Sequence, residues 1–181
     1  VSQMVRNSVK SFRSVAEVRN LDIRMSIPEN DVMVFCSIDA VDSILSNLLS
    51  NAVKYCNTYF EISLVEDNDK IVVRVNSDGN RIPEKESERI FEAFYQSKNI
   101  ESHGAGIGLT YSRSLALLQG GQLYLDTKVS DANSFVLELP KNSLIEDSDI
   151  ETQMVENELL TRDKSCILVV KDNYRMREAI K

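Results

Sequence analysis

Two amides and an ammonium group follow one face of a predicted helix. Asn47, Asn51 and Lys54 stand at positions i, i+4 and i+7, a spacing that places side chains in one stripe of an α-helix. Amide oxygens are hard, neutral ligands suited to Mg²⁺, and a lysine ammonium neutralises phosphate charge. The stripe therefore indicates a site for a magnesium–phosphate group. A solvated polar helix face would explain the same spacing.

A glycine-rich run, GAGIGL at residues 104–109, opens a second predicted helix over residues 107–119. Glycines let the backbone approach phosphate oxygens closely, and a helix N-terminus favours negative charge. A flexible glycine hinge is the alternative interpretation. A Rossmann-type dinucleotide site is disfavoured, because that motif requires a strand immediately before the glycines and residues 96–103 are polar.

Two further segments lie between the amide stripe and the glycine run. Residues 73–83 combine a short alternating strand with a tight Asp-Gly turn, and residues 90–96 (IFEAFYQ) are rich in aromatic side chains. Ordinary anchoring in a hydrophobic core would explain the aromatic residues on their own. The order of all four segments along the chain is the more specific signal.

In that order, the segments resemble the N box, first glycine box, F box and second glycine box of sensor histidine kinases. The resemblance covers about residues 1–140. It implies the ATP-binding GHKL fold shared with gyrase and Hsp90, an α+β two-layer sandwich in which helices back a mixed β-sheet. It also implies a function: with Mg²⁺, such a catalytic core supplies the γ-phosphoryl group of ATP to a histidine on an upstream dimerisation domain.

The resemblance assigns roles to residues of this chain. Asn51 corresponds to the magnesium-ligating asparagine, Asn47 to its upstream polar partner and Lys54 to the phosphate-contacting lysine, so Asn47 and Lys54 are the expected catalytic residues. The remaining nucleotide contacts implied by the resemblance are Tyr55, Ser77, Asp78, Gly79, Ile82, Tyr95, Gly104, Gly106, Ile107, Gly108 and Leu109.

The first glycine box departs from the family pattern. That box usually reads Asp-x-Gly-x-Gly, and its Asp accepts a hydrogen bond from the adenine amino group. Here Ser77 stands in the position of the Asp, Asp78 follows one step later, and Arg81 replaces the second glycine. A serine accepts without charge assistance. This favours, as an alternative function, a non-catalytic nucleotide-sensing module; a pure interaction domain fits the intact stripe and glycine run less well.

The chain lacks a phospho-acceptor histidine in a helical setting. Its one histidine, His103, precedes the glycine run and reads as a solvated loop residue. The cysteines Cys36, Cys56 and Cys166 are far apart, which predicts free thiols in a reducing compartment, with neither a zinc site nor a disulfide framework. We therefore expect no self-phosphorylation by this chain.

The composition suits one domain with an appendage. The chain has 181 residues, 43% of them hydrophobic, and a formal net charge of -7. The acidic excess argues against direct nucleic-acid binding, because neutralising phosphates requires surplus Lys and Arg. Periodicity predicts helices over 2–19, 39–56 (capped by Asp39) and 107–119. Alternation predicts strands at 21–27, 32–36, 60–64, 73–75, 123–125 and 135–139.

The C-terminal part predicts a second region. Residues 141–164 read as an acidic linker, and the apolar run 166–170 followed by Lys171-Asp172 resembles the start of a response-regulator receiver domain over 165–181. That resemblance implies a hybrid two-component sensor that is homodimeric at full length. It also predicts a downstream receiver partner and a location on the cytoplasmic side of a membrane-anchored protein.

Overall fold

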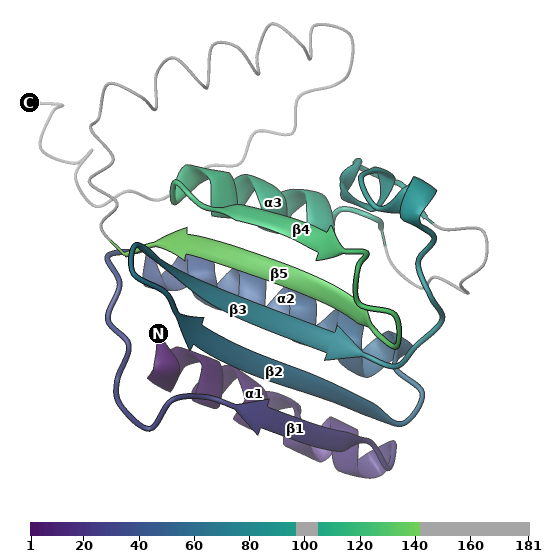
Figure 1. The fold of residues 1–181 in the computed structure, drawn as a ribbon. Coiled ribbons are helices and arrows are strands. Elements are labelled where there is room, and N and C mark those ends of the chain that lie inside the picture. Colours follow the sequence, from purple (N-terminus) through teal and green to yellow (C-terminus); the bar gives the residue numbers. More distant parts are fainter. Residues whose placement is uncertain (97–104, 142–181) are drawn as a thin grey trace, which may run out of the picture. The chain divides into compact units, whose positions relative to one another are not determined.

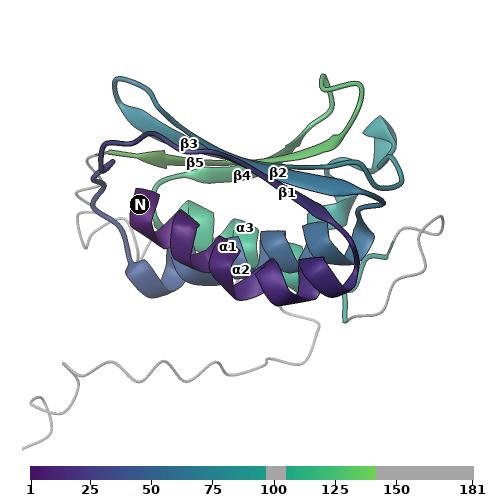
Figure 2. The same ribbon diagram turned by 90° about the horizontal axis from the view of Figure 1, so that it is seen from below.

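The computed structural model describes residues 1–96 and 105–141, which form a twisted β-sheet with helices on one face (Figures 1 and 2). The helices in this part of the chain are α1 (Ser2–Val18), α2 (Ile38–Tyr55) and α3 (Gly108–Leu118), with two 3₁₀ turns, η1 (Glu84–Glu86) and η2 (Arg89–Phe91). The strands are β1 (Asp22–Ser26), β2 (Tyr59–Glu66), β3 (Lys70–Ser77), β4 (Gln122–Asp126) and β5 (Asn133–Pro140).

The sheet is mixed and has the strand order β1-β2-β3-β5-β4. β1 pairs with β2 in parallel, because α2 intervenes and carries the chain back to the same end of the sheet. β2 and β3 form the predicted antiparallel hairpin, and β5 pairs antiparallel with both β3 and β4. This α+β arrangement confirms the predicted fold class.

The core lies between the helices and one face of the sheet. α2 runs along the middle of that face, with α1 on the side of β1 and α3 on the side of β4 (Figure 1). Alternate side chains of β2 and β3 point inward, as the period of two requires. Fully burying one large apolar side chain is worth about 1.5–3 kcal/mol. The largest fully buried side chains include Ile44, Leu45, Leu48 and Leu49 of α2 and Phe60, Ile62, Ile71, Leu137 and Leu139 of the sheet.

The predicted strand at residues 32–36 is wrong. This segment belongs to no strand. The amino group of Val1 donates a hydrogen bond to the Val32 carbonyl at 2.8 Å, and the Phe35 N–H donates to the carbonyl of Lys141, just after β5, at 3.4 Å. Met33 and Phe35 are 79% and 76% exposed. The alternation is present in the sequence, but the segment pairs with no strand of the sheet.

The cap predicted for the second helix was also misplaced. α2 begins after Ser37, whose hydroxyl accepts a hydrogen bond from the Ala40 N–H at 3.3 Å, and Asp39 lies in the first turn. Both residues are good N-cap candidates by type. Ser37 is favoured by its backbone, which is extended at this position, and its N–H is bound by the Gln119 side chain at 2.6 Å.

The third predicted helix has apolar residues at a helical spacing, Ile107, Tyr111, Leu115 and Leu118, but this face meets the core only in part. Leu115 packs against the core, whereas Tyr111 is 51% exposed and Leu118 41%, and the fully buried residues of α3 are Ser112 and Ala116. The polar Ser112 is buried because its hydroxyl has a partner on α2, described below. Apolar periodicity counts only apolar residues, so it could not identify the polar Ser112 as a residue on the buried face of this helix.

The predicted receiver segment at 165–181, His103, Gly104 and, apart from Lys141, the predicted linker at 141–164 lie outside the described residues. None of the helices in the described ranges combines the length and the apolar character that crossing a membrane requires.

Candidate functional site

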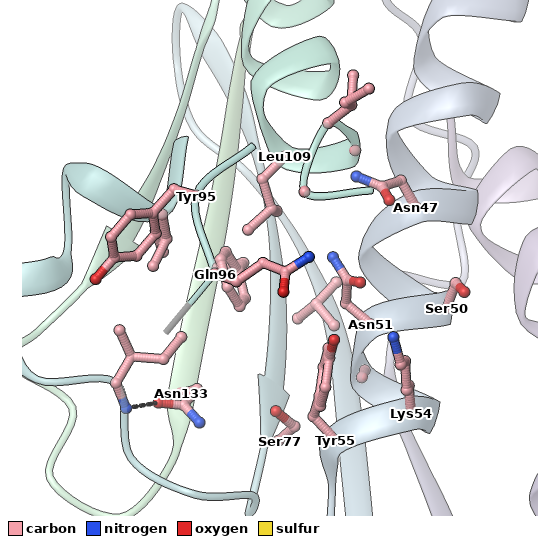
Figure 3. Close-up of a pocket in the computed structure, with 18 of the residues that line it drawn as sticks. Asn47, Ser50, Asn51, Lys54, Tyr55, Ser77, Tyr95, Gln96, Leu109 and Asn133 are labelled. Carbon is pink, nitrogen blue, oxygen red and sulfur yellow. Dashed lines mark hydrogen bonds between the residues drawn. The ribbon is translucent and has the colours of Figure 1, made fainter. Parts of the chain in front are cut away.

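A cavity of about 400 Å³ lies between α2, the end of β3, the segment after η2 and the N-terminus of α3 (Figure 3). It brings together residues that are far apart in the sequence. The predicted site residues that line it are Asn47, Asn51, Lys54, Tyr55, Ser77, Ile82, Tyr95, Gly106, Ile107, Gly108 and Leu109.

One end of the cavity is polar, and we call it the α2–α3 end. It consists of Asn47, Asn51 and Lys54 on α2 and of the glycine run at the start of α3. In Figure 3 the three α2 side chains lie along one side of the cavity, with Asn47 beside the start of α3. The stripe predicted from the i, i+4, i+7 spacing therefore faces the cavity.

The Asn47 amide is held in place by α3. Its Nδ2 donates a hydrogen bond to the Ser112 Oγ at 2.8 Å, which leaves the Oδ1 directed at Gly108. A Cβ at position 108 would lie 2.4 Å from that oxygen, so a side chain there would displace the amide. Gly108 thus lets α2 and α3 approach closely enough for the amide to sit at the helix N-terminus.

Gly106 takes a backbone conformation that favours glycine. Its φ is +68°, and a Cβ would lie 2.9 Å from the Tyr95 carbonyl oxygen and 3.0 Å from the Phe94 backbone. The Gly106 carbonyl accepts a hydrogen bond from the Phe94 N–H at 2.9 Å. The glycine run is therefore tied to the F-box segment on one side and to α2 on the other.

The electrostatics of the lining are one-sided. Among the described residues that line the cavity there is one basic side chain, Lys54, and no carboxylate. The positive end of the α3 dipole opens onto the same space. In the described part of the chain, no group of three or more His, Cys, Asp or Glu side chains could hold a metal ion. The α2–α3 end therefore suits an anion, and a divalent metal there would need oxygen ligands from that anion.

The opposite end, which we call the β3 end, is mainly apolar. Val75, Ile82, Ile90 and Phe135 line it, and Ser77 supplies a hydroxyl. Ser77 is the last residue of β3 and is 6% exposed. This combination suits a flat, largely apolar group with a polar edge.

The turn after β3 is fixed by Asn133 of β5. The Asn133 Oδ1 accepts a hydrogen bond from the Ile82 N–H at 2.9 Å, and its Nδ2 donates to the Asn80 carbonyl at 2.9 Å and to the Gly79 carbonyl at 3.4 Å. Figure 3 shows the bond to the turn beside Ser77. Because this amide is engaged with the turn, Asn133 positions the wall of the β3 end.

Asp78 lies outside the cavity lining. Its carboxylate accepts hydrogen bonds from the backbone N–H groups of Asn57, Thr58 and Tyr59 at 2.9 to 3.2 Å, and from the Thr58 hydroxyl. Burial alone would raise the pKa of Asp78, but the bonds from Thr58, Tyr59 and Asn57 outweigh it and lower that pKa. This carboxylate joins the turn after α2 to the turn after β3.

Gly79 and Arg81 are also occupied in holding the fold. A Cβ at Gly79 would lie 2.0 Å from the Tyr55 carbonyl oxygen, so the turn passes directly against the C-terminus of α2. The Arg81 guanidinium donates to the Ala132 carbonyl and, at 3.1 Å, to the Thr127 carbonyl. None of Asp78, Gly79 and Arg81 is part of the described lining.

The aromatic segment forms the wall facing α2. Phe91 is buried and packs edge-on against Phe135 with 6.4 Å between ring centroids. Tyr95 lines the cavity; burial and a hydrogen bond to Glu86 raise the pKa of Tyr95. The Arg89 guanidinium lies 4.7 Å from the centroid of the Tyr95 ring.

Sequence reasoning missed several lining residues. Gln96 is the last residue of the 90–96 segment, and Figure 3 shows its amide reaching across the cavity toward Asn51. Its neighbour in sequence, Tyr95, was the available signal. Asn133 and Phe135 had none, because β5 enters the site only through pairing with β3. The other lining residues not predicted are Ser50, Ala52, Val75, Asn80, Ile90 and Ala105.

Comparison with known proteins identifies the class of this site. Residues 36–143 match the family described as histidine kinase-, DNA gyrase B-, and HSP90-like ATPase, and the chain belongs to that family. Together with the fold, this match identifies the ATP-binding catalytic domain of a histidine kinase.

Individual relatives are distant. The adaptive-response sensory kinase SasA of Synechocystis sp. is 26% identical over 144 residues, which are 77% of this chain and 38% of that protein. The chain spans less than half the length of the curated relatives it matches first.

Solved structures share the fold. The nucleotide-free catalytic domain of the histidine kinase ThkA has a TM-score of 0.69 at 25% identity, covering 77% of this chain and 92% of that one. Full-length ShkA, solved in complex with AMPPNP, has a TM-score of 0.69 at 21% identity, covering 77% of this chain and 29% of that one.

Proposed function

We propose that residues 1–140 bind Mg-ATP in this cavity and present its γ-phosphoryl group to a histidine on an upstream dimerisation domain. The observation that carries the proposal is the α2–α3 end: an ammonium, two amides and a glycine-rich helix N-terminus face one space that no described carboxylate lines. Such an end stabilises a polyphosphate. The apolar β3 end has the character required for the base.

The donor groups fit Mg²⁺ as a partner of the nucleotide. The amide oxygens of Asn51 and Asn47 are hard and neutral, and phosphate oxygens complete the kind of oxygen shell that Mg²⁺ prefers. When bound, the ion supplies positive charge that offsets the charge of the phosphates. Asn51 is the residue we assign to the ion, and Ser112 holds the Asn47 amide beside it.

Catalysis in this proposal rests on positioning and charge. A nitrogen of the acceptor histidine attacks the γ-phosphorus, the bond from that phosphorus to the β–γ bridging oxygen breaks, and ADP leaves with the bond's electron pair. Lys54 offsets negative charge on the phosphates, and the α3 N-terminus adds its dipole. Tyr95 and Leu109 line the cavity, and in this proposal they restrict the access of water to the reacting phosphate.

Titration with ATP, with and without Mg²⁺, tests the binding step. We expect Mg²⁺ to tighten binding to the parent chain and Asn51→Ala to remove that dependence. Asn68→Ala, a matched change in the exposed β2–β3 turn, should leave it intact. Equal Mg-ATP and ATP affinities in the parent, or an unchanged dependence in Asn51→Ala, would contradict the assignment.

A second candidate is a nucleotide sensor without kinase activity. Ser77 in place of the family's Asp favours it, since Asp78 is bound to the turn after α2 and does not line the cavity. The two candidates differ in phosphoryl transfer. A supplied dimerisation domain carrying its histidine should become labelled from ATP if the chain is a kinase, and should stay unlabelled if it only senses nucleotide.

We further propose that the whole protein is a homodimeric hybrid sensor, anchored in a membrane and signalling through a downstream receiver domain. The apolar run at 166–170, followed by Lys171-Asp172, supports the receiver. Sequencing the gene upstream and downstream of the segment that encodes residues 1–181 tests this. A receiver-like continuation with an aspartate after a later buried strand would support the hybrid arrangement, and its absence would contradict it.

A further inference from the structure

The β3 end offers a base few polar groups. Val75, Ile82, Ile90 and Phe135 supply its apolar surface, and Ser77, 6% exposed, supplies a hydroxyl at the end of β3. In Figure 3 the Ser77 side chain lies between Tyr55 and Asn133, at the far side of the cavity from Asn47. A nucleotide with its phosphates at the α2–α3 end would therefore direct the far edge of its base toward Ser77.

Two polar side chains near Ser77, those of Asp78 and Asn133, already have hydrogen-bond partners in the surrounding turns. The Asp78 carboxylate is bound by the 57–59 turn, and the Asn133 amide is bonded to the turn at 79–82. No carboxylate belongs to the described lining. The contact with the far edge of a base thus falls to neutral side chains, and of Ser77 and Asn80 only Ser77 is buried, at the end of β3.

A hydroxyl does not distinguish the two purines by hydrogen-bond type. The far edge of adenine carries an amino donor beside a ring-nitrogen acceptor, whereas guanine carries a carbonyl acceptor beside a ring N–H donor. A serine Oγ both donates and accepts, so it can pair with either edge, whereas an ionised carboxylate only accepts. A carboxylate opposite position 6 would accept from the adenine amino group and repel the guanine carbonyl.

We propose that this site binds purine nucleotides with little preference for adenine over guanine, and that Ser77 is the residue that sets the base specificity. The proposal rests on the proposed function, because it places the phosphates at the α2–α3 end. It widens the substrate class from adenine nucleotides to purine nucleoside di- and triphosphates.

Calorimetric titration of the 1–181 chain with Mg-ADP and with Mg-GDP tests the proposal. We expect the two dissociation constants to agree within about threefold, the effect of one neutral hydrogen bond. Ser77→Asp should favour Mg-ADP over Mg-GDP by about tenfold, because a charge-assisted acceptor then faces position 6. Ser77→Ala should weaken both nucleotides alike, by about threefold.

Ser63→Asp is the matched control. Ser63 lies on β2 and alternates with the inward-facing Ile62 and Leu64, so it points to the sheet face away from the helices. This change should leave the ratio of the two affinities unaltered. A parent that prefers Mg-ADP more than tenfold, or a Ser77→Asp chain with an unchanged ratio, would overturn the inference and leave the proposed function standing. Binding of neither nucleotide would overturn both.

Discussion

The two ends of the cavity are built in different ways. At the α2–α3 end, the polar groups expected from the sequence face the cavity: Asn47, Asn51 and Lys54 come from one helix, and Gly108 admits the Asn47 amide. At the β3 end, half of the expected motif is used elsewhere. Ser77 and Ile82 line the cavity, whereas Asp78 and Gly79 hold the turn against α2.

The two ends therefore place different requirements on the sequence. At the α2–α3 end, a helix face and a helix N-terminus set the spacing of the polar groups. At the β3 end, Val75 and Ser77 come from β3, Phe135 from β5 and Ile82 from the turn after β3, so several elements must be held together. The departures of this chain from the histidine-kinase pattern, Ser77 and Arg81, both occur at or just after the end of β3, and of the two only Ser77 lines the cavity.

Gly79→Ala should have the largest effect, and it should act on stability. The added Cβ would lie 2.0 Å from the Tyr55 carbonyl oxygen, and that atom belongs to the last residue of α2 and cannot rotate away. We expect the free energy of unfolding to fall by about 3 kcal/mol, the upper range for overpacking. Urea denaturation measures it. A loss below about 1 kcal/mol would show that the turn can move, and would remove the distinction drawn between the two ends.

Gly108→Ala should instead act on binding. Here the added Cβ meets a side-chain atom, the Asn47 Oδ1 at 2.4 Å, and that amide can rotate away. The fold should lose about 1–2 kcal/mol, less than in Gly79→Ala, because moving the Asn47 amide leaves the buried Ser112 hydroxyl without its partner while alanine favours the first turn of α3. Mg-nucleotide affinity should fall more than tenfold because the displaced amide leaves the site. Parallel calorimetry and urea denaturation check both parts, and unfolding comparable with that of Gly79→Ala would contradict the contrast.

Elements with a continuous pattern were predicted well. The apolar period of α2 runs without a gap from Val41 to Val53, and the predicted 39–56 agrees with Ile38–Tyr55. The β2–β3 hairpin and β5 follow an alternating pattern, which Val65, Val72 and Val136 interrupt, and were also predicted. These segments bury one face completely, so tertiary structure and local pattern require the same residues.

The failures have a common physical cause. Residues 32–36 alternate like a strand, but a strand needs a free edge, and the neighbouring edge is not identifiable from local sequence. The buried face of α3 is decided by the Ser112–Asn47 hydrogen bond, which crosses 65 positions. Asn133 reaches the site through the β3–β5 pairing. In these cases contacts between residues far apart in the sequence determine the structure, and local periodicity cannot predict such contacts.

Asp78→Asn should give the smallest of the three effects, and one that depends on pH. The Asp78 carboxylate accepts several hydrogen bonds from residues 57–59, which outweigh the effect of burial and hold its pKa below its ordinary value near 3.8. A group with a lowered pKa in the folded state stabilises the fold above the unfolded-state pKa and loses that contribution as the pH falls through the folded-state value. At pH 7 the variant should therefore be less stable than the parent by about 1–2 kcal/mol, since an amide nitrogen would face N–H donors. As the pH falls below about 4 the difference should shrink.

Urea denaturation of both chains across this range measures the difference in stability. Asp69→Asn, in the exposed β2–β3 turn, is the control that should change little at any pH. A difference between parent and Asp78→Asn that stays constant down to the acid limit would mean that the negative charge of Asp78 contributes nothing to the turn, because the protonated side chain would then stabilise the fold as well as the ionised one. The acceptor geometry of the two carboxyl oxygens, which an amide lacks, would then account for the whole stability difference.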